Sequence, residues 1–290
     1  MHVRAMLLRG LLLALLLVPA QAAAEDRRLA TAAEAVQDAV LRAQPRLLAR
    51  QLDQLAPQRP GVVDLYFLGF GGDAVHDVFL KEVRSAQALF DQRFDTRQRS
   101  VVMANSRRRV KGMPLASIDN LRAALGAIGA RIDPAEDVVF LYLTSHGSPK
   151  RFLSVFSPYA RLENLQAQAL RDMLDEAGIG WRVVVISACF SGSFIDALKD
   201  ERTLILTAAS KSRASFGCNN EDDYTYFGDA YLNRGLRRGH SFIDAFTQAK
   251  AEIAAREAAE GLKPSRPQIS LGSRIGSKLD ALERRLRATQ

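Results

Sequence analysis

Continuous apolar stretches alternate with amphipathic stretches through most of the chain. The apolar stretches cover residues 62–70, 100–105, 137–145, 181–188 and 203–209. Runs of about four to eight apolar residues bounded by Gly or Ser are typical of strands buried on both faces of a parallel sheet. The stretches between them carry apolar residues at helical spacing, as at Val78, Val83 and Phe90. The alternation predicts an α/β fold with a mostly parallel sheet and helices on both of its faces.

The helices follow from periodicity and from capping residues. We expect helices over residues 76–94, 117–132, 162–177, 193–198, 227–236 and 241–259, then a short strand over 267–271 and a basic C-terminal helix. The second of these helices opens with Ser117-Ile118-Asp119-Asn120, which is an acceptable cap region. Residues 25–59 also look helical but polar, and Pro57 and Pro60 end that segment.

The first 24 residues differ from the rest of the chain. Arg4 and Arg9 precede a short apolar stretch from Leu11 to Val18, and Ala22 and Ala24 offer small residues for cleavage. This pattern predicts a signal peptide, with an uncleaved anchor as the alternative. No later apolar run approaches the roughly 20 residues that a membrane span needs. We therefore expect a periplasmic or secreted protein with a signal peptide over 1–24, a helical extension over 25–60 and one main domain over 61–290.

Composition and charge change this picture little. The 290 residues are 48% hydrophobic and 25% charged, which is ordinary for a globular protein. The formal net charge is +8, and one dense basic run covers residues 107–111. Such a run can bind an anionic partner, but a solvated loop after a strand is the simpler interpretation. Without zinc-finger spacing or interleaved aromatic and basic residues, we expect no nucleic-acid partner.

The chain has two cysteines, Cys189 and Cys218. In an exported protein, a disulfide between them is an open alternative. The local sequence favours two free thiols, because Cys189 follows a buried strand and precedes a helix, which is a reactive location. Cys218 lies in an irregular Gly/Asn-rich stretch, and we expect it to be a passive, packed thiol.

Two of the predicted strands end in side chains that can do chemistry. Residues 137–145 lead into His146 and Gly147, and residues 181–188 lead into Cys189. The carboxyl ends of parallel strands meet at one edge of a sheet, where ligands bind. A thiol nucleophile with a histidine acid/base is therefore predicted at this edge. The N–H groups of Gly147 and Cys189 are the candidate donors for an oxyanion.

Other candidates are weaker. His76 begins a predicted helix and His240 lies in a turn, so neither follows a buried strand. No cluster of His, Cys and carboxylates has the spacing of a metal site, and we expect no metal and no cofactor.

The two blocks resemble the caspase-like cysteine peptidases, in which one apolar block ends in His-Gly and a second ends in Ala-Cys. The segment Ser-Ala-Cys-Phe-Ser-Gly-Ser at 187–193 is similar to Glu-Ala-Cys-Glu-Ser-Gly-Ser of the legumain branch. The order and spacing of residues 207–209, 215–218 and 226–231 also parallel legumains. The resemblance covers roughly residues 62–272 and is stronger for the bacterial members.

The resemblance implies a three-layer α/β/α caspase–hemoglobinase-like fold with a mostly parallel six-stranded sheet. It also implies a His146/Cys189 dyad and a thioester acyl-enzyme. In legumains an Arg-His pair, a Glu, a Ser and an Asp form the pocket for a substrate Asn. Ser215 and Asp229 match the Ser and the Asp, whereas Ser187 stands at the Glu position. Gly71-Gly72-Asp73 replace the Arg-His pair, so an Asn preference is not expected to carry over.

Three functions are compatible with these residues. An exported cysteine endopeptidase, which hydrolyses peptide or protein substrates through the dyad, is the favoured hypothesis. A transpeptidase or transamidase would use the same site, with an amine in place of water. A non-catalytic binding protein that keeps the fold is the third, and it is motivated by the altered pocket residues. The sequence does not settle the oligomeric state.

Overall fold

The computed structural model describes residues 28, 30–107 and 112–288. The chain separates into two compact units, Met1–Ala43 and Gln44–Gln290. The predicted signal peptide and most of the basic run over 107–111 lie outside the described residues. In the smaller unit, residues 30–43 are helical. Among the described residues, no helix is long and apolar enough to cross a membrane.

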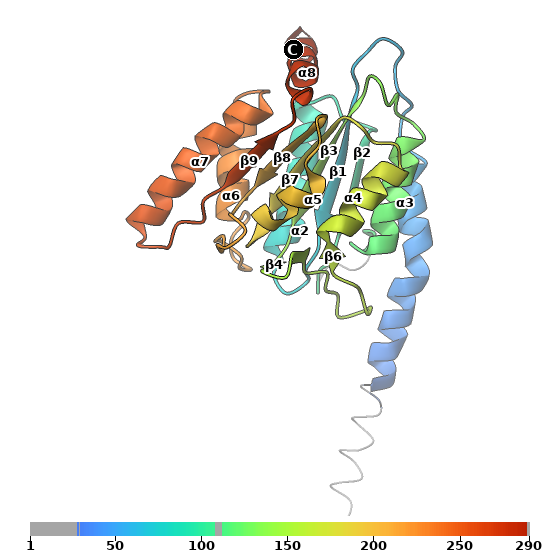
Figure 1. Cartoon of the computed structure of the whole chain (residues 1–290). Helices are drawn as coiled ribbons and strands as arrows, with labels where there is room; N and C mark the ends of the chain where they lie inside the picture. The colour runs from blue at the N-terminus through green and yellow to red at the C-terminus, as the bar shows by residue number, and fades with distance from the viewer. Residues whose placement is uncertain (1–27, 29, 108–111, 289–290) are drawn as a thin grey trace, which may run out of the picture. The chain divides into compact units, whose positions relative to one another are not determined.

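A six-stranded sheet forms the centre of the larger unit (Figure 1). The strand order is β2-β1-β3-β7-β8-β9. The strands are β1 (Leu65–Gly71), β2 (Ser100–Ala104), β3 (Val138–Thr144), β7 (Arg182–Ser187), β8 (Thr203–Thr207) and β9 (Gln268–Leu271). The first five of these strands in spatial order pair in parallel, and β9 pairs antiparallel with β8 at one edge. The predicted mostly parallel six-stranded α/β sheet is thus confirmed.

Successive side chains of the central strands enter two different cores. Phe67, Phe140 and Val185 belong to the first core, and Leu68, Leu141 and Val184 belong to the second. The alternation is the period of two that a strand imposes on its side chains. Both faces are apolar because helices cover both of them, as expected for a parallel sheet.

Helices on the two faces complete a three-layer arrangement. The first core includes residues of α2 (Val78–Arg93), η2 (Asp229–Leu236), α7 (Phe242–Ala259) and α8 (Ile275–Ala288). The second core includes residues of α3 (Ile118–Gly129), α4 (Ala167–Glu176) and α5 (Ile195–Leu198). In Figure 1, α4 and α5 lie in front of the sheet and α2 lies behind it. The remaining short helices are η1 (Ser191–Phe194) and α6 (Tyr226–Gly228).

The helix starts show why the sequence folds this way locally. Ser117 accepts a hydrogen bond from the N–H of Asn120 at 3.2 Å, so the cap region predicted at the start of α3 is confirmed, with Ser117 as the N-cap. Ser241 caps α7 in the same way, through the N–H of Asp244. Each cap satisfies a backbone donor that the first turn of a helix leaves unpaired.

A second, three-stranded sheet was not predicted. It contains β4 (Gly147–Ser148), β5 (Phe152–Leu153) and β6 (Leu165–Gln166), in the order β4-β5-β6. All its pairings are antiparallel. Because residues 165–166 belong to this sheet, α4 begins at Ala167 and not at residue 162 as expected. The small sheet continues directly from the end of β3 and shapes the segment that follows His146.

The strand order reverses direction between β1 and β3. From β1 the chain passes through α2 to β2 on one side, and then through α3 to β3 on the other side of β1. In an open parallel sheet, the carboxyl ends of strands at such a reversal border a crevice that binds ligands. The loops that follow β1 and β3 are therefore the expected location of a ligand-binding or active site.

Candidate active site

His146 lies two residues beyond the end of β3. All seven residues of β3 are buried, and His146 is the first residue in this segment that is partly exposed. Its carbonyl accepts a hydrogen bond from the N–H of Ser154 at 2.8 Å, which ties it to the small sheet. The imidazole ring stands edge-on to Phe79, with 5.0 Å between the ring centroids. The strand and this aromatic contact hold the ring at the carboxyl edge of the sheet.

Gly147 brings the His146 segment directly against the backbone of Cys189. A β-carbon placed on Gly147 would lie 1.8 Å from the carbonyl oxygen of Cys189, so only glycine fits here. Gly147 of β4 lies opposite Leu153 of the antiparallel strand β5. The residues next to them, His146 and Ser154, are joined by a backbone hydrogen bond. In that geometry Gly147 occupies a non-hydrogen-bonded position, and its N–H points away from β5. This N–H is free of the small sheet, as an oxyanion donor requires.

Cys189 lies two residues beyond the end of β7, the strand next to β3. The next residue, Phe190, has a φ of +57°, a left-handed conformation that side chains other than glycine rarely adopt. This turn sends the chain into η1 and leaves the thiol partly exposed at the edge of the sheet. Strained backbone of this kind is concentrated at functional sites.

Ser215 is the polar neighbour of the Cys189 thiol. Its N–H lies 3.2 Å from Sγ, and its hydroxyl oxygen lies 3.6 Å from the same sulfur. Its carbonyl oxygen also lies 3.6 Å from Sγ and can accept the thiol proton. Ser215 therefore contacts the candidate nucleophile through its backbone and its side chain.

The ring of His76 lies against the ring of His146. Nδ1 of His76 is 2.9 Å from Nε2 of His146, and the two ring planes are 76° apart. Sequence reasoning ranked His76 low because no buried strand precedes it. His76 instead reaches the edge from the loop between β1 and α2, at the reversal of strand order. A histidine near that reversal was the available signal, but it appears only once the strand order is known.

Asp73 supplies a buried charge beside this pair of rings. Its side chain is 3% exposed, and it accepts hydrogen bonds from the N–H of Val75 at 2.7 Å and the hydroxyl of Ser154 at 2.6 Å. Burial lowers the pKa of His146, the negative charge of Asp73 opposes that effect, and the charge of His76 adds to it. His146 therefore stays neutral, and able to accept a proton, to a lower pH than an ordinary histidine.

Ser187 joins a buried polar network below the edge. Its hydroxyl lies 3.0 Å from that of Thr225, whose N–H donates to the carboxylate of Glu82 at 2.7 Å. Tyr142 of β3 donates to the other oxygen of Glu82 at 2.7 Å. Burial raises the pKa of Glu82, and these hydrogen bonds partly oppose it. The network links α2, β3 and β7 just below His146 and Cys189, so it supports the strands that carry them.

Asp229, Cys218 and His240 are the remaining residues that the sequence analysis considered. Asp229 binds Asn233 at 2.8 Å and forms an ion pair with Arg234, and these contacts lower its pKa against the opposing effect of burial. Cys218 and Cys189 are both free thiols, and burial raises the pKa of Cys218 to about 12. His240 stands edge-on to Phe94, with 5.4 Å between the ring centroids. Among the described residues, no group of three or more His, Cys, Asp or Glu could hold a metal ion.

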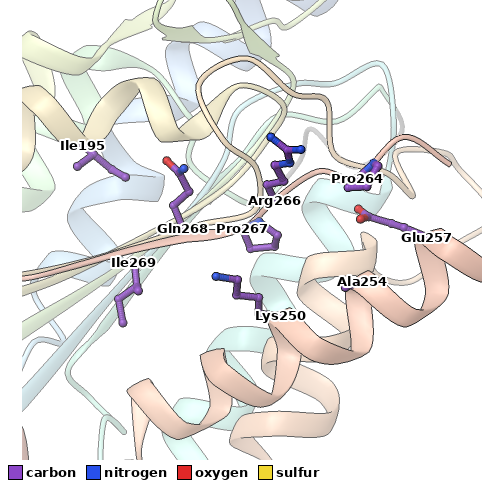
Figure 2. Close-up of a pocket in the computed structure, with 9 residues that line it drawn as sticks. All are labelled: Ile195, Lys250, Ala254, Glu257, Pro264, Arg266, Pro267, Gln268 and Ile269. Atoms are coloured by element: carbon purple, nitrogen blue, oxygen red, sulfur yellow. The ribbon is translucent and has the colours of Figure 1, made fainter.

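A cavity of about 580 Å³ lies elsewhere, between the edge strand β9 and α7 (Figure 2). Lys250, Ala254 and Glu257 line it from α7, and Pro267, Gln268 and Ile269 line it from the strand side. Both oxygens of Glu257 accept a hydrogen bond from the N–H of Ser265, at 3.1 and 3.0 Å. The lining of the cavity includes two cationic side chains, Lys250 and Arg266, but neither a cysteine nor a histidine.

A thiol and an imidazole at the ends of neighbouring parallel strands are the groups that a cysteine-dependent hydrolase needs. Residues 122–277 match the family model described as the peptidase C13 family. Because this match spans more than half of the 290 residues, the chain belongs to that family and is a legumain-type cysteine peptidase. The match begins within α3, so β1, β2 and His76 lie outside it.

Comparison with solved structures gives caspase-1 from Spodoptera frugiperda as a similar protein. The TM-score is 0.49 and the sequence identity is 10%, over 75% of this chain and 93% of the caspase chain. Comparison with curated proteins gives no match.

Proposed function

We propose that the chain is an exported endopeptidase in which Cys189 is the nucleophile and His146 is the acid/base. The observation that carries the proposal is the direct contact of the two strand ends, where Gly147 lies against the carbonyl of Cys189. That contact fixes the imidazole and the thiol at one edge of the sheet. The proposal of export rests on the leader pattern of residues 1–24. N-terminal sequencing of the protein from the periplasmic or secreted fraction tests it, and we expect a mature N-terminus directly after Ala22 or Ala24.

The reaction follows from the groups at this edge. His146 takes the proton of Cys189, and Sγ attacks the carbonyl carbon of the peptide bond. The N–H groups of Gly147 and Cys189 hold the oxyanion that forms. The C–N bond then breaks, and His146 gives its proton to the departing amine, which leaves a thioester on Sγ. Water attacks the thioester, His146 accepts a proton from it, and the C–S bond breaks as the thiol regains its proton.

The sequence assigns substrate binding to Ser187, Ser215 and Asp229, and the geometry supports direct contact with substrate best for Ser215. Ser215 contacts Sγ and therefore lies where the residue before the cut must pass. Asp229 is held by Asn233 and Arg234, so a substrate side chain would meet a carboxylate that is already paired. Ser187 is buried and bound to Thr225, which favours a role below the pocket and not on its surface.

The test is hydrolysis of fluorescein-labelled casein by the purified protein and by Cys189→Ala. Cys218→Ala is the matched control, because it removes the other thiol of the chain. We expect hydrolysis to disappear in Cys189→Ala and to persist in Cys218→Ala. Equal hydrolysis by the wild type and Cys189→Ala would contradict the proposal. Mass spectrometry of the products with added glycinamide separates the two reactions, since amide-capped fragments would indicate a transamidase.

A further inference from the structure

The partner of His146 in this site is another histidine. Nδ1 of His76 lies 2.9 Å from Nε2 of His146, so one of the two nitrogens donates a proton to the other. A neutral imidazole has one N–H and one acceptor nitrogen, and the hydrogen bond at one nitrogen decides which proton the ring carries. The contact therefore engages Nε2 of His146 and leaves Nδ1 for the reaction.

Asp73 is the buried carboxylate whose charge acts on His146, but the hydrogen bonds that its two oxygens accept come from other residues. Oδ1 accepts from the N–H of Val75 at 2.7 Å, and Oδ2 accepts from the hydroxyl of Ser154 at 2.6 Å. It acts on His146 through its charge, which favours the imidazolium. The directional contact that fixes the ring thus comes from His76.

Both sides of the His76 segment are anchored. The turn at Asp73 holds the chain before it, and the N–H of Asp77 donates to the side chain of Asn220 at 2.9 Å. The ring also stands edge-on to Phe79, with 6.5 Å between the centroids and planes 81° apart. Phe79 contacts His146 as well, so the three rings form one edge-to-face cluster. A histidine held this way is pre-organised to bind one nitrogen of its neighbour.

We propose that His76 is a positioning residue: it accepts the Nε2 proton of His146, so that Nδ1 of His146 exchanges protons with Cys189, the leaving amine and water. This inference rests on the proposed function of His146. In the resting state His76 carries its proton on Nε2, and its Nδ1 is the acceptor. When the thiol proton reaches Nδ1 of His146, the ring becomes an imidazolium and its Nε2–H bond to His76 becomes charge-assisted. When that proton passes to the amine, the original state returns and no net proton stays on the pair.

Two substitutions test this role. His76→Phe keeps a ring against Phe79 but removes the acceptor, whereas the Oδ1 of Asn in His76→Asn can take the place of Nδ1. With fluorescein-labelled casein, we expect kcat of His76→Phe to fall about 10- to 100-fold, because an unheld ring is a poorer acid/base. We expect KM to change less than about threefold, and kcat of His76→Asn to stay within about threefold of the wild type.

The ¹⁵N chemical shifts of the His146 ring report which of its nitrogens carries the proton. If His76 only supported the fold, its replacement would leave these shifts unchanged. In the wild type and in His76→Asn, the Nε2–H tautomer should dominate. In His76→Phe, the two tautomers should mix. Thermal unfolding of each variant shows whether it is folded.

The outcomes separate this inference from the proposed function. Loss of activity in Cys189→Ala together with full kcat in a folded His76→Phe would overturn the role of His76 alone. A failure of His76→Asn to restore kcat, with an unchanged His146 tautomer in His76→Phe, would also overturn it. Unchanged activity in Cys189→Ala would overturn the function itself, whatever His76 does.

Discussion

The edge of the sheet that carries His146 and the cavity between β9 and α7 differ in a way that identifies the site. The edge brings a thiol, two imidazoles and a buried carboxylate together, through contacts as short as 2.9 Å between His76 and His146. The cavity is roomy, at about 580 Å³, and its lining contains neither cysteine nor histidine. The comparison supports our proposal that the reactive groups at the ends of parallel strands, and not the available volume, mark the active site.

The largest effect should come from removing the imidazole at the edge. For His146→Ala we expect casein hydrolysis to fall about 10²- to 10⁴-fold, since the variant lacks the group that moves the proton. His240→Ala is the matched control, because it removes an imidazole that packs against Phe94. Measured per folded molecule, its rate should equal that of the wild type. Equal losses of casein hydrolysis in His146→Ala and His240→Ala would contradict the proposal that the edge of the sheet carries the catalytic imidazole.

The next largest effect should come from Gly147→Ala. Its new β-carbon would lie 1.8 Å from the carbonyl oxygen of Cys189, so the two strand ends must move apart. A displacement of about 1 Å at reacting groups costs about 100-fold in rate, and this is the loss we expect in kcat. The control is Gly126→Ala in α3, where the new β-carbon would meet no atom within 4 Å outside the adjoining backbone of its own helix. It should keep its activity and gain up to about 1 kcal/mol of stability.

Retention of full activity by Gly147→Ala would show that the contact between the strand ends is not needed. Melting temperatures of both glycine variants separate a loss of rate from a loss of folded protein.

The pH dependence of casein hydrolysis tests the electrostatic environment of His146. Burial lowers the pKa of His146, so the neutral imidazole persists below its ordinary pKa of about 6.5. The acid limb of kcat/KM for casein should therefore have its midpoint below about pH 6.5. Asp73 raises the pKa of His146, so Asp73→Asn should move this midpoint to still lower pH. A midpoint that moves to higher pH in Asp73→Asn would contradict this electrostatic assignment.

The smallest effect should come from the cavity. Lys250→Ala and Ile269→Ser change its lining without touching His146 or Cys189. Substitutions at exposed positions usually change free energies by less than about 0.5 kcal/mol, so casein hydrolysis should stay within about twofold of the wild type. A loss above tenfold in either variant would place part of the substrate site at β9 and weaken the comparison.

The central sheet was predictable because its strands are buried on both faces. Each gives a continuous apolar run with a sharp end, as in residues 138–144. His146 and Cys189 became the candidate residues because they stand at two of those ends. The small sheet was missed because its strands are two residues long, too short for any periodicity. The contact of His76 with His146 was not predicted because it joins residues 70 positions apart in sequence.

Helix boundaries were less predictable than the strands. The helix expected over 227–236 begins one residue earlier as α6 and continues as the π-helical η2. At that start the N–H of Thr225 donates to the side-chain carboxylate of Glu82, a tertiary interaction that local periodicity does not encode.

The most direct test of the central claim is the rate at which iodoacetamide modifies each cysteine, mapped by mass spectrometry in the wild type and in His146→Ala. Ser215 directs donors at Sγ of Cys189, whereas burial raises the pKa of Cys218 to about 12 and keeps it a thiol. The account predicts rapid modification of Cys189, slow modification of Cys218, and a clear slowing at Cys189 alone in His146→Ala. Equal rates at the two cysteines, or a rate at Cys189 that does not depend on His146, would contradict it.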